Sequence, residues 1–165
     1  MDKQHQIVII GGGTAGIMTA TQLLKKNASL DIAIIDPAET HYYQPAWTLV
    51  GAGAYDYKNT ARSMASLIPK SVTWVKDFVT SLQADEHTID TENSGKIGYE
   101  FLVVAPGLVM DPSLIEGLTE AMEKGIVCSN YTNPEHTWET IKNFKGGNAL
   151  FTQPTTPIKC GGAPQ

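Results

Sequence analysis

The feature that most constrains this chain is a glycine-rich turn between a short apolar strand and an amphipathic helix. Residues 6–10 (QIVII) are apolar and β-branched, which is typical of a buried strand. Residues 14–26 (TAGIMTATQLLKK) show helical periodicity and end in two lysines. Residues 31–36 (DIAIID) indicate a second buried strand. Because two strands joined by a crossover helix pair in parallel, the first 36 residues predict a βαβ unit.

The turn has the spacing G-x-G-x-x-G at Gly11, Gly13 and Gly16. The first glycine permits a tight turn, the second lets the backbone approach a diphosphate, and the third lets the helix pack close to the strand. Asp36 ends the next strand, 20 residues after Gly16, where a carboxylate binds a ribose hydroxyl and disfavours a 2′-phosphate. The pattern predicts a Rossmann-like α/β fold for FAD or NAD, and NADP is not expected. The alternative is a nucleotide-free α/β protein in which Asp36 is merely exposed.

The layout after the second strand favours FAD. Residues 72–80 alternate like a strand, and residues 81–98 contain turn residues that predict a small antiparallel β-meander beside the parallel sheet. The apolar strand 99–105 then ends in Ala105-Pro106-Gly107, where we expect Ala105 and Gly107 to contact the cofactor. Flavoproteins of the disulfide-reductase type continue in this way, and their strand usually ends Ala-Thr-Gly. Pro106 departs from that pattern by one residue.

Composition excludes several classes of function. The net charge is −5 with no basic run, which argues against a nucleic-acid partner. No apolar stretch approaches the ~20 residues of a membrane span, and the polar residues 1–6 do not resemble a signal peptide. Four scattered histidines show no metal-ligand spacing with the cysteines, so no metal is expected. Two cysteines make no disulfide scaffold, which favours a reducing compartment.

Cys160 is the candidate reactive residue. Small residues and a proline follow it in CGGAPQ, and a cysteine at the start of a helix has a stabilised thiolate. A small buried thiol in a loop is the alternative. Residues 134–144 predict a helix and residues 148–152 a last strand, but no second G-x-G-x-x-G follows that strand. This absence favours a thiol over NAD(P)H as electron donor.

Two longer stretches resemble the sulfide:quinone oxidoreductase family. They are HYYQPAWTLVGAG (41–53) and TPIKCGGAPQ (156–165), and SNYT (129–132) is also similar. The resemblance implies an FAD enzyme that oxidises sulfide through a redox cysteine and passes two electrons to a quinone. It places Thr14 and Ala15 on the diphosphate turn, and Gln44 and the backbone of Val79 against FAD. Cys160 matches one of the family's two redox cysteines.

The resemblance also implies what this chain lacks. The partner redox cysteine, a Gly-Asp segment of the FAD site and C-terminal amphipathic helices have no counterpart in these 165 residues. Cys128 is interpreted as structural and not as a replacement. We therefore expect a truncated chain: residues 1–110 as the first part of an FAD-binding domain, and residues 111–165 as a connection and the start of a second dinucleotide-type domain.

Two other functions remain open from the sequence. One is an NADH:quinone-type flavoprotein dehydrogenase, and the other is an inactive, truncated nucleotide-binding module. Membrane association is expected only through the missing C-terminal part. The expected location is therefore cytoplasmic or peripheral on the inner membrane face, mitochondrial in a eukaryote.

Overall fold

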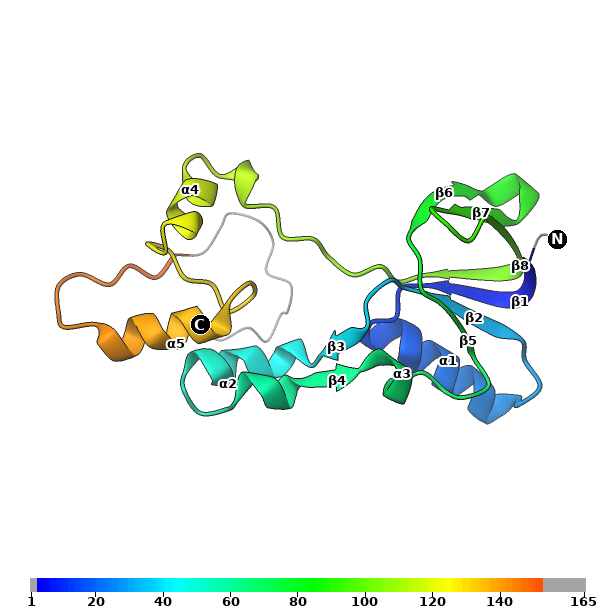
Figure 1. Ribbon diagram of the computed structural model, residues 1–165, viewed down its shortest axis with the longest axis horizontal. Coiled ribbons are helices and arrows are strands. Elements are labelled where there is room, and N and C mark those ends of the chain that lie inside the picture. The colour runs from blue at the N-terminus through cyan, green and yellow to red at the C-terminus, as the bar shows by residue number, and fades with distance from the viewer. Residues whose placement is uncertain (1–2, 153–165) are drawn as a thin grey trace.

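A six-stranded sheet forms the main body of the protein in a computed structural model that describes residues 3–152 (Figure 1). Its strand order is β5-β2-β1-β8-β7-β6. The strands are β1 (Lys3–Ile10), β2 (Ile32–Ile35), β5 (Thr73–Val75), β6 (Val79–Gln83), β7 (Thr88–Thr91) and β8 (Lys96–Val104). The first four in the order pair in parallel, and β8, β7 and β6 form an antiparallel meander. The predicted α/β fold with its small meander is confirmed.

Both faces of the central strands are buried, as the apolar runs predict. Ile9 and Ile34 face helix α1 (Thr14–Lys26), where Ala20 and other apolar residues complete one cluster. Val8 and Ile35 point to the other face and share a second cluster with residues of the meander. Burial of these aliphatic side chains, each worth about 1.5–3 kcal/mol, holds the helix and the meander onto the sheet. The Gly-rich turn is thereby fixed between β1 and α1.

A long excursion leaves the sheet after β2 and returns at β5. It contains the antiparallel pair β3 (Thr40–Tyr42) and β4 (Ala61–Ser63), helices α2 (Trp47–Gly51) and α3 (Met64–Leu67), and two 3-10 turns, η1 (Gln44–Ala46) and η2 (Tyr57–Thr60). The remaining elements are η3 (Ala84–Glu86), η4 (Pro112–Leu114), α4 (Leu118–Glu123) and α5 (Pro134–Asn143). None of the helices in the described part of the chain is both long enough and apolar enough to traverse a bilayer.

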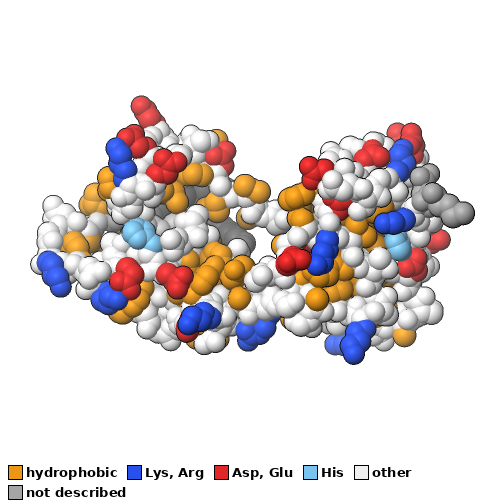
Figure 2. All heavy atoms as spheres, viewed as in Figure 1, with side chains coloured by type: hydrophobic (Ala, Val, Ile, Leu, Met, Phe, Trp, Pro, Cys, Tyr) orange, Lys and Arg blue, Asp and Glu red, His pale blue; other side chains and the backbone are white. Residues whose placement is uncertain are grey.

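Helices α2, α4 and α5 form a second, smaller body beside the sheet (Figure 1). Trp138 of α5 lies against the backbone of Gly53, just after α2. Tyr42 stacks on Tyr57 at 5.4 Å between ring centroids, at the base of this body. The β3–β4 pair and residues 105–111 connect the two bodies. Hydrophobic side chains gather on the facing sides of both bodies (Figure 2), and Val109 in the connection is 94% exposed.

Two predicted strands differ in the structure. The strand expected over residues 72–80 is interrupted, because the chain leaves β5 after Val75 and crosses to the meander before β6 begins. Residues 148–152 form no strand, and Phe151 is 91% exposed. A strand needs a neighbour to satisfy its backbone hydrogen bonds, and no described strand lies beside this segment.

Asp77 explains the interruption between β5 and β6. It is 2% exposed, and its carboxylate accepts hydrogen bonds from the backbone of Phe78 (2.9 Å), Asn93 (2.9 Å) and Ser94 (2.6 Å). The side-chain amide of Asn93 donates a fourth bond at 3.1 Å. Burial by itself would raise the pKa of Asp77, but these bonds outweigh it and hold the pKa well below its usual range. The charged carboxylate therefore ties the crossover to the turn between β7 and β8.

Replacing Asp77 with asparagine should lower the midpoint of thermal unfolding by several degrees at pH 7. The amide would turn a donor toward backbone N–H groups that need an acceptor. Because the folded-state pKa is lowered, the stabilisation is fully present above the unfolded pKa of about 3.9 and is lost as the pH falls below it. The difference in unfolding midpoint between Asp77→Asn and the unmodified chain should therefore become smaller as the pH falls below about 3.9.

The matched control is Asp85→Asn, which makes the same charge change at an exposed carboxylate in η3. It should leave the unfolding midpoint unchanged across the same pH range. Equal midpoints for Asp77→Asn and Asp85→Asn at pH 7 would contradict the role assigned to Asp77.

Candidate dinucleotide-binding site

The Gly-rich turn brings the end of β1 against the end of β8. Gly11 has φ +102°, a conformation that favours glycine, and its N–H donates to the carbonyl oxygen of Ile35 at 2.9 Å. A Cβ on Gly11 would lie 2.1 Å from the carbonyl oxygen of Ala105. The first glycine therefore allows three strand ends to meet at one point.

The other two glycines of the motif differ in their surroundings. A Cβ on Gly16 would lie 1.9 Å from the carbonyl oxygen of Gly11, so only glycine lets α1 start this close to the turn. A Cβ on Gly13 would meet nothing within 4 Å. No side chain caps the N-terminus of α1, and its first turn has no acidic residue. The open space at Gly13 therefore lies beside free N–H groups and the positive end of the helix dipole, next to the exposed Thr14 and Ala15.

Asp36 faces this turn. Its Oδ2 accepts a hydrogen bond from the N–H of Gly12 at 2.6 Å, and its Oδ1 accepts one from the N–H of Ala38 at 2.7 Å. Each carboxylate oxygen can accept a second bond. The carboxylate thus lies within hydrogen-bond reach of the glycine turn and keeps acceptor capacity for a sugar hydroxyl.

The remaining predicted residues lie at different distances from the turn. The N–H of Ala105 donates to the carbonyl of Ile10 at 2.8 Å, which keeps Ala105 against the turn, and Gly107 follows with φ +79°. Val79, at the start of β6, packs on the cluster that contains Ile35. Gln44 is exposed in η1, on the excursion, and no hydrogen bond joins it to the turn among residues 3–152.

The structure leaves the predicted redox residue outside the described residues, because Cys160 falls beyond residue 152. Cys128 is a half-buried free thiol in the segment between α4 and α5. Within residues 3–152, no three His, Cys, Asp or Glu side chains come together as a metal site.

Sequence reasoning missed the surroundings of Asp36. The indole Nε1 of Trp74 donates to the carbonyl oxygen of Asp36 at 2.9 Å. Lys76 lies 4.5 Å from the Trp74 ring centroid and pairs with Glu39 at 2.7 Å. The hydrogen bond and charge of Lys76 lower the pKa of Glu39. The only signal in the sequence is that Trp74 and Lys76 flank the end of a strand.

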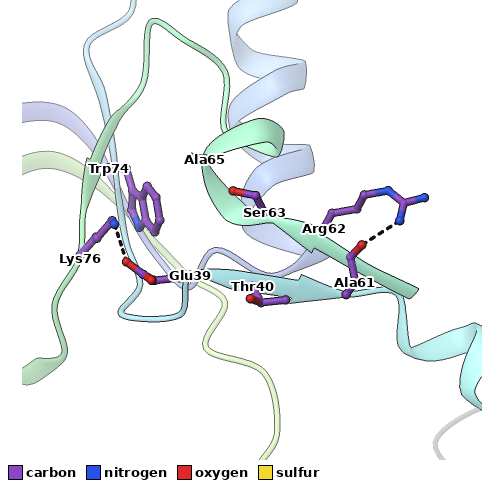
Figure 3. Close-up of a pocket in the computed structure, with 8 residues that line it drawn as sticks. All are labelled: Glu39, Thr40, Ala61, Arg62, Ser63, Ala65, Trp74 and Lys76. Atoms are coloured by element: carbon purple, nitrogen blue, oxygen red, sulfur yellow. Dashed lines mark hydrogen bonds and ion pairs between the residues drawn. The ribbon is translucent and has the colours of Figure 1, made fainter. Parts of the chain in front are cut away.

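An open cavity of about 470 Å³ lies beside this group (Figure 3). Trp74, Lys76 and Glu39 form one side of it, and Ser63 and Ala65 lie across from them. The cavity therefore borders the strand end that carries Asp36.

Comparisons with known proteins agree with this geometry. A family model described as pyridine nucleotide-disulphide oxidoreductase matches residues 5–144. The chain is 43% identical over 165 residues to the mitochondrial sulfide:quinone oxidoreductase of Mus musculus, covering 99% of this chain and 37% of that protein. It is 46% identical over 164 residues to the mitochondrial sulfide:quinone oxidoreductase of Dictyostelium discoideum, covering 97% and 36%.

A solved structure extends the similarity to three dimensions. The sulfide:quinone oxidoreductase of Aquifex aeolicus matches with a TM-score of 0.67 and 28% identity, over 85% of this chain and 31% of that chain. The present chain spans about 37% of the length of the mouse relative. Together with the match over residues 5–144, these similarities show that the chain belongs to the pyridine nucleotide-disulphide oxidoreductase family, as a homologue of the sulfide:quinone oxidoreductases.

Proposed function

We propose that this chain is the FAD-binding N-terminal part of a sulfide:quinone oxidoreductase. The observation that carries the proposal is the convergence of the glycine turn and Asp36. An open space at Gly13 lies beside the uncapped N-terminus of α1, and the carboxylate reaches the same turn at 2.6 Å from the N–H of Gly12. Anionic phosphates and a ribose are the groups that such an arrangement accepts.

The residues present fit FAD. The N–H groups near Thr14 and Ala15 would bind the diphosphate, and Asp36 would accept a hydrogen bond from the adenosine ribose. We also propose contacts from the backbone of Val79 and from Gln44, with Ala105 and Gly107 along the same edge of the sheet. Bound FAD would supply two-electron acceptor chemistry.

The rest of the proposal concerns the substrates. We infer that sulfide is the electron donor and that a quinone is the final acceptor. Sulfide would attack a sulfur bridge between Cys160 and the partner cysteine of the whole protein, which breaks the bridge, leaves one sulfur as a persulfide and frees the other as a thiolate. The electron pair would then pass from that thiolate to bound FAD and on to the quinone. The resemblance around Cys160 and the names of the relatives support this inference. Contact with a membrane quinone and a mitochondrial location belong to the same proposal. The division at residue 110 into an FAD-binding part and a second dinucleotide-type part also stays a proposal.

Alanine substitutions at Gly13 and Gly16 test the FAD site. Gly13→Ala should leave the stability of the cofactor-free chain nearly unchanged, because its Cβ enters open space. It should weaken FAD binding by about tenfold or more, because the methyl group occupies the approach of the diphosphate. Gly16→Ala should instead destabilise the cofactor-free chain by about 1–3 kcal/mol through its contact with the Gly11 carbonyl. Flavin absorbance after gel filtration and thermal unfolding measure the two effects.

The unmodified chain serves as the reference in this experiment. A colourless protein that takes up no added FAD would contradict the proposal and favour an inactive nucleotide-binding module. Equal FAD affinity for Gly13→Ala and the unmodified chain would show that the diphosphate does not approach this turn.

A chimera tests the proposed chemistry. In it, this chain replaces the matching part of the mouse sulfide:quinone oxidoreductase. Sulfide should bleach the flavin absorbance and reduce an added quinone. Cys160→Ser should lower quinone reduction by sulfide at least about a hundredfold, because a hydroxyl is a poor nucleophile in sulfur exchange.

Cys128→Ser is the matched control and should retain the activity of the chimera. Full activity of Cys160→Ser would refute the role of this cysteine. Bleaching of the flavin by NADH, with no response to sulfide, would instead identify an NADH:quinone-type dehydrogenase.

A further inference from the structure

We propose that Trp74 is a positioning residue for the dinucleotide site, acting through the backbone of Asp36 without touching the cofactor. The inference rests on the proposed function for its effect on FAD, but its structural part is independent of FAD. It assigns a role to an indole N–H group that the sequence motif does not include.

Asp36 lies where the parallel ladder of β2 ends. Its N–H donates to the carbonyl oxygen of Val75 at 3.1 Å, which is the last backbone bond from this strand to β5. Pro37 follows and has no N–H with which to continue the ladder. The peptide group between Asp36 and Pro37 therefore depends on some other group to hold its carbonyl oxygen.

Trp74 supplies that group. Its Nε1 donates to the carbonyl oxygen of Asp36 at 2.9 Å, so both backbone polar groups of Asp36 are tied to β5. The indole ring itself packs partly buried against the cluster that contains Ile34 and Met64. A ring held by packing presents its N–H at a constant place, which is what a positioning donor requires.

Lys76 and Glu39 extend the same side of the site (Figure 3). The ammonium group of Lys76 lies over the Trp74 ring and pairs with the carboxylate of Glu39. The side chains of Lys76 and Glu39 are 51% and 74% exposed, so their ion pair contributes little on its own. Within this group of side chains, the indole of Trp74 makes the hydrogen bond to the Asp36 backbone.

The position of Asp36 matters because its side chain reaches the glycine turn. Oδ2 accepts the N–H of Gly12 at 2.6 Å, a distance that a rotation of the Asp36 backbone would lengthen. The remaining acceptor sites of the carboxylate then point where a ribose hydroxyl is expected. Trp74 thus acts on the orientation of the Asp36 carboxylate toward the glycine turn, whose own shape depends on Gly11 and Gly16.

The test compares Trp74→Phe with Trp47→Phe in the 165-residue chain. Both substitutions keep an aromatic ring and remove one indole donor, and the Trp47 donor bonds Thr60 at 3.3 Å, away from Asp36. The first readout, without FAD, is an exchange ratio: the rate of amide hydrogen exchange at Gly12 divided by the rate at Ile34 in the centre of β2. Trp74→Phe should raise this ratio about tenfold, and Trp47→Phe should leave it unchanged.

The second readout is the Kd for FAD, which should rise about tenfold in Trp74→Phe only. An unchanged ratio of Gly12 to Ile34 exchange in Trp74→Phe overturns the inference. Loss of a residue that only stabilises the fold would raise the exchange rates of Gly12 and Ile34 equally. A changed ratio with an unchanged Kd overturns the functional part of the inference. If the unmodified chain binds no FAD but Trp74→Phe still raises the ratio of Gly12 to Ile34 exchange, the proposed function fails and the positioning of Asp36 by Trp74 stands.

Discussion

The close approach of α1 to the glycine turn is the constraint on which the candidate site depends. Because Gly16 has no side chain, the helix starts directly over the carbonyl of Gly11, and the first amide groups of the helix open onto the end of the sheet. Asp36 then joins the same turn through the N–H of Gly12. The packing at Gly16 and the hydrogen bond from Gly12 to Asp36 belong to the fold itself, so a dinucleotide would meet donors and acceptors that the backbone holds in place. Such preorganisation reduces the entropy lost on binding.

The sequence was sufficient to predict the parts of the fold that depend on local pattern. Apolar runs of β-branched residues predicted β1 and β2, the helical period predicted α1, and the glycine spacing predicted the turn. The position of Asp36 followed from parallel topology, since carboxyl ends of adjacent parallel strands lie at one edge. These predictions succeeded because each rests on interactions between residues close in sequence or on a general rule of topology.

The parts that could not be predicted depend on contacts between distant residues. Asp77 breaks a strand pattern only because the backbone of Asn93 and Ser94, in a later turn, supplies donors for it. The donation from Trp74 to the Asp36 carbonyl joins residues 38 positions apart. The association of α2 with α5 is also invisible to periodicity, since both helices are short. Residues 148–152 carry a strand pattern, but no strand within residues 3–152 lies beside them.

The connection between the two bodies has a mechanical consequence. The chain crosses between them three times, out along β3, back along β4 and out again through residues 105–111 (Figure 1). A single tether would permit free swivelling, whereas several tethers at separate points restrict a joint to bending about the line between them. The hydrogen-bonded β3–β4 pair is one such tether, and residues 105–111 are a second one without a paired neighbour among the described strands.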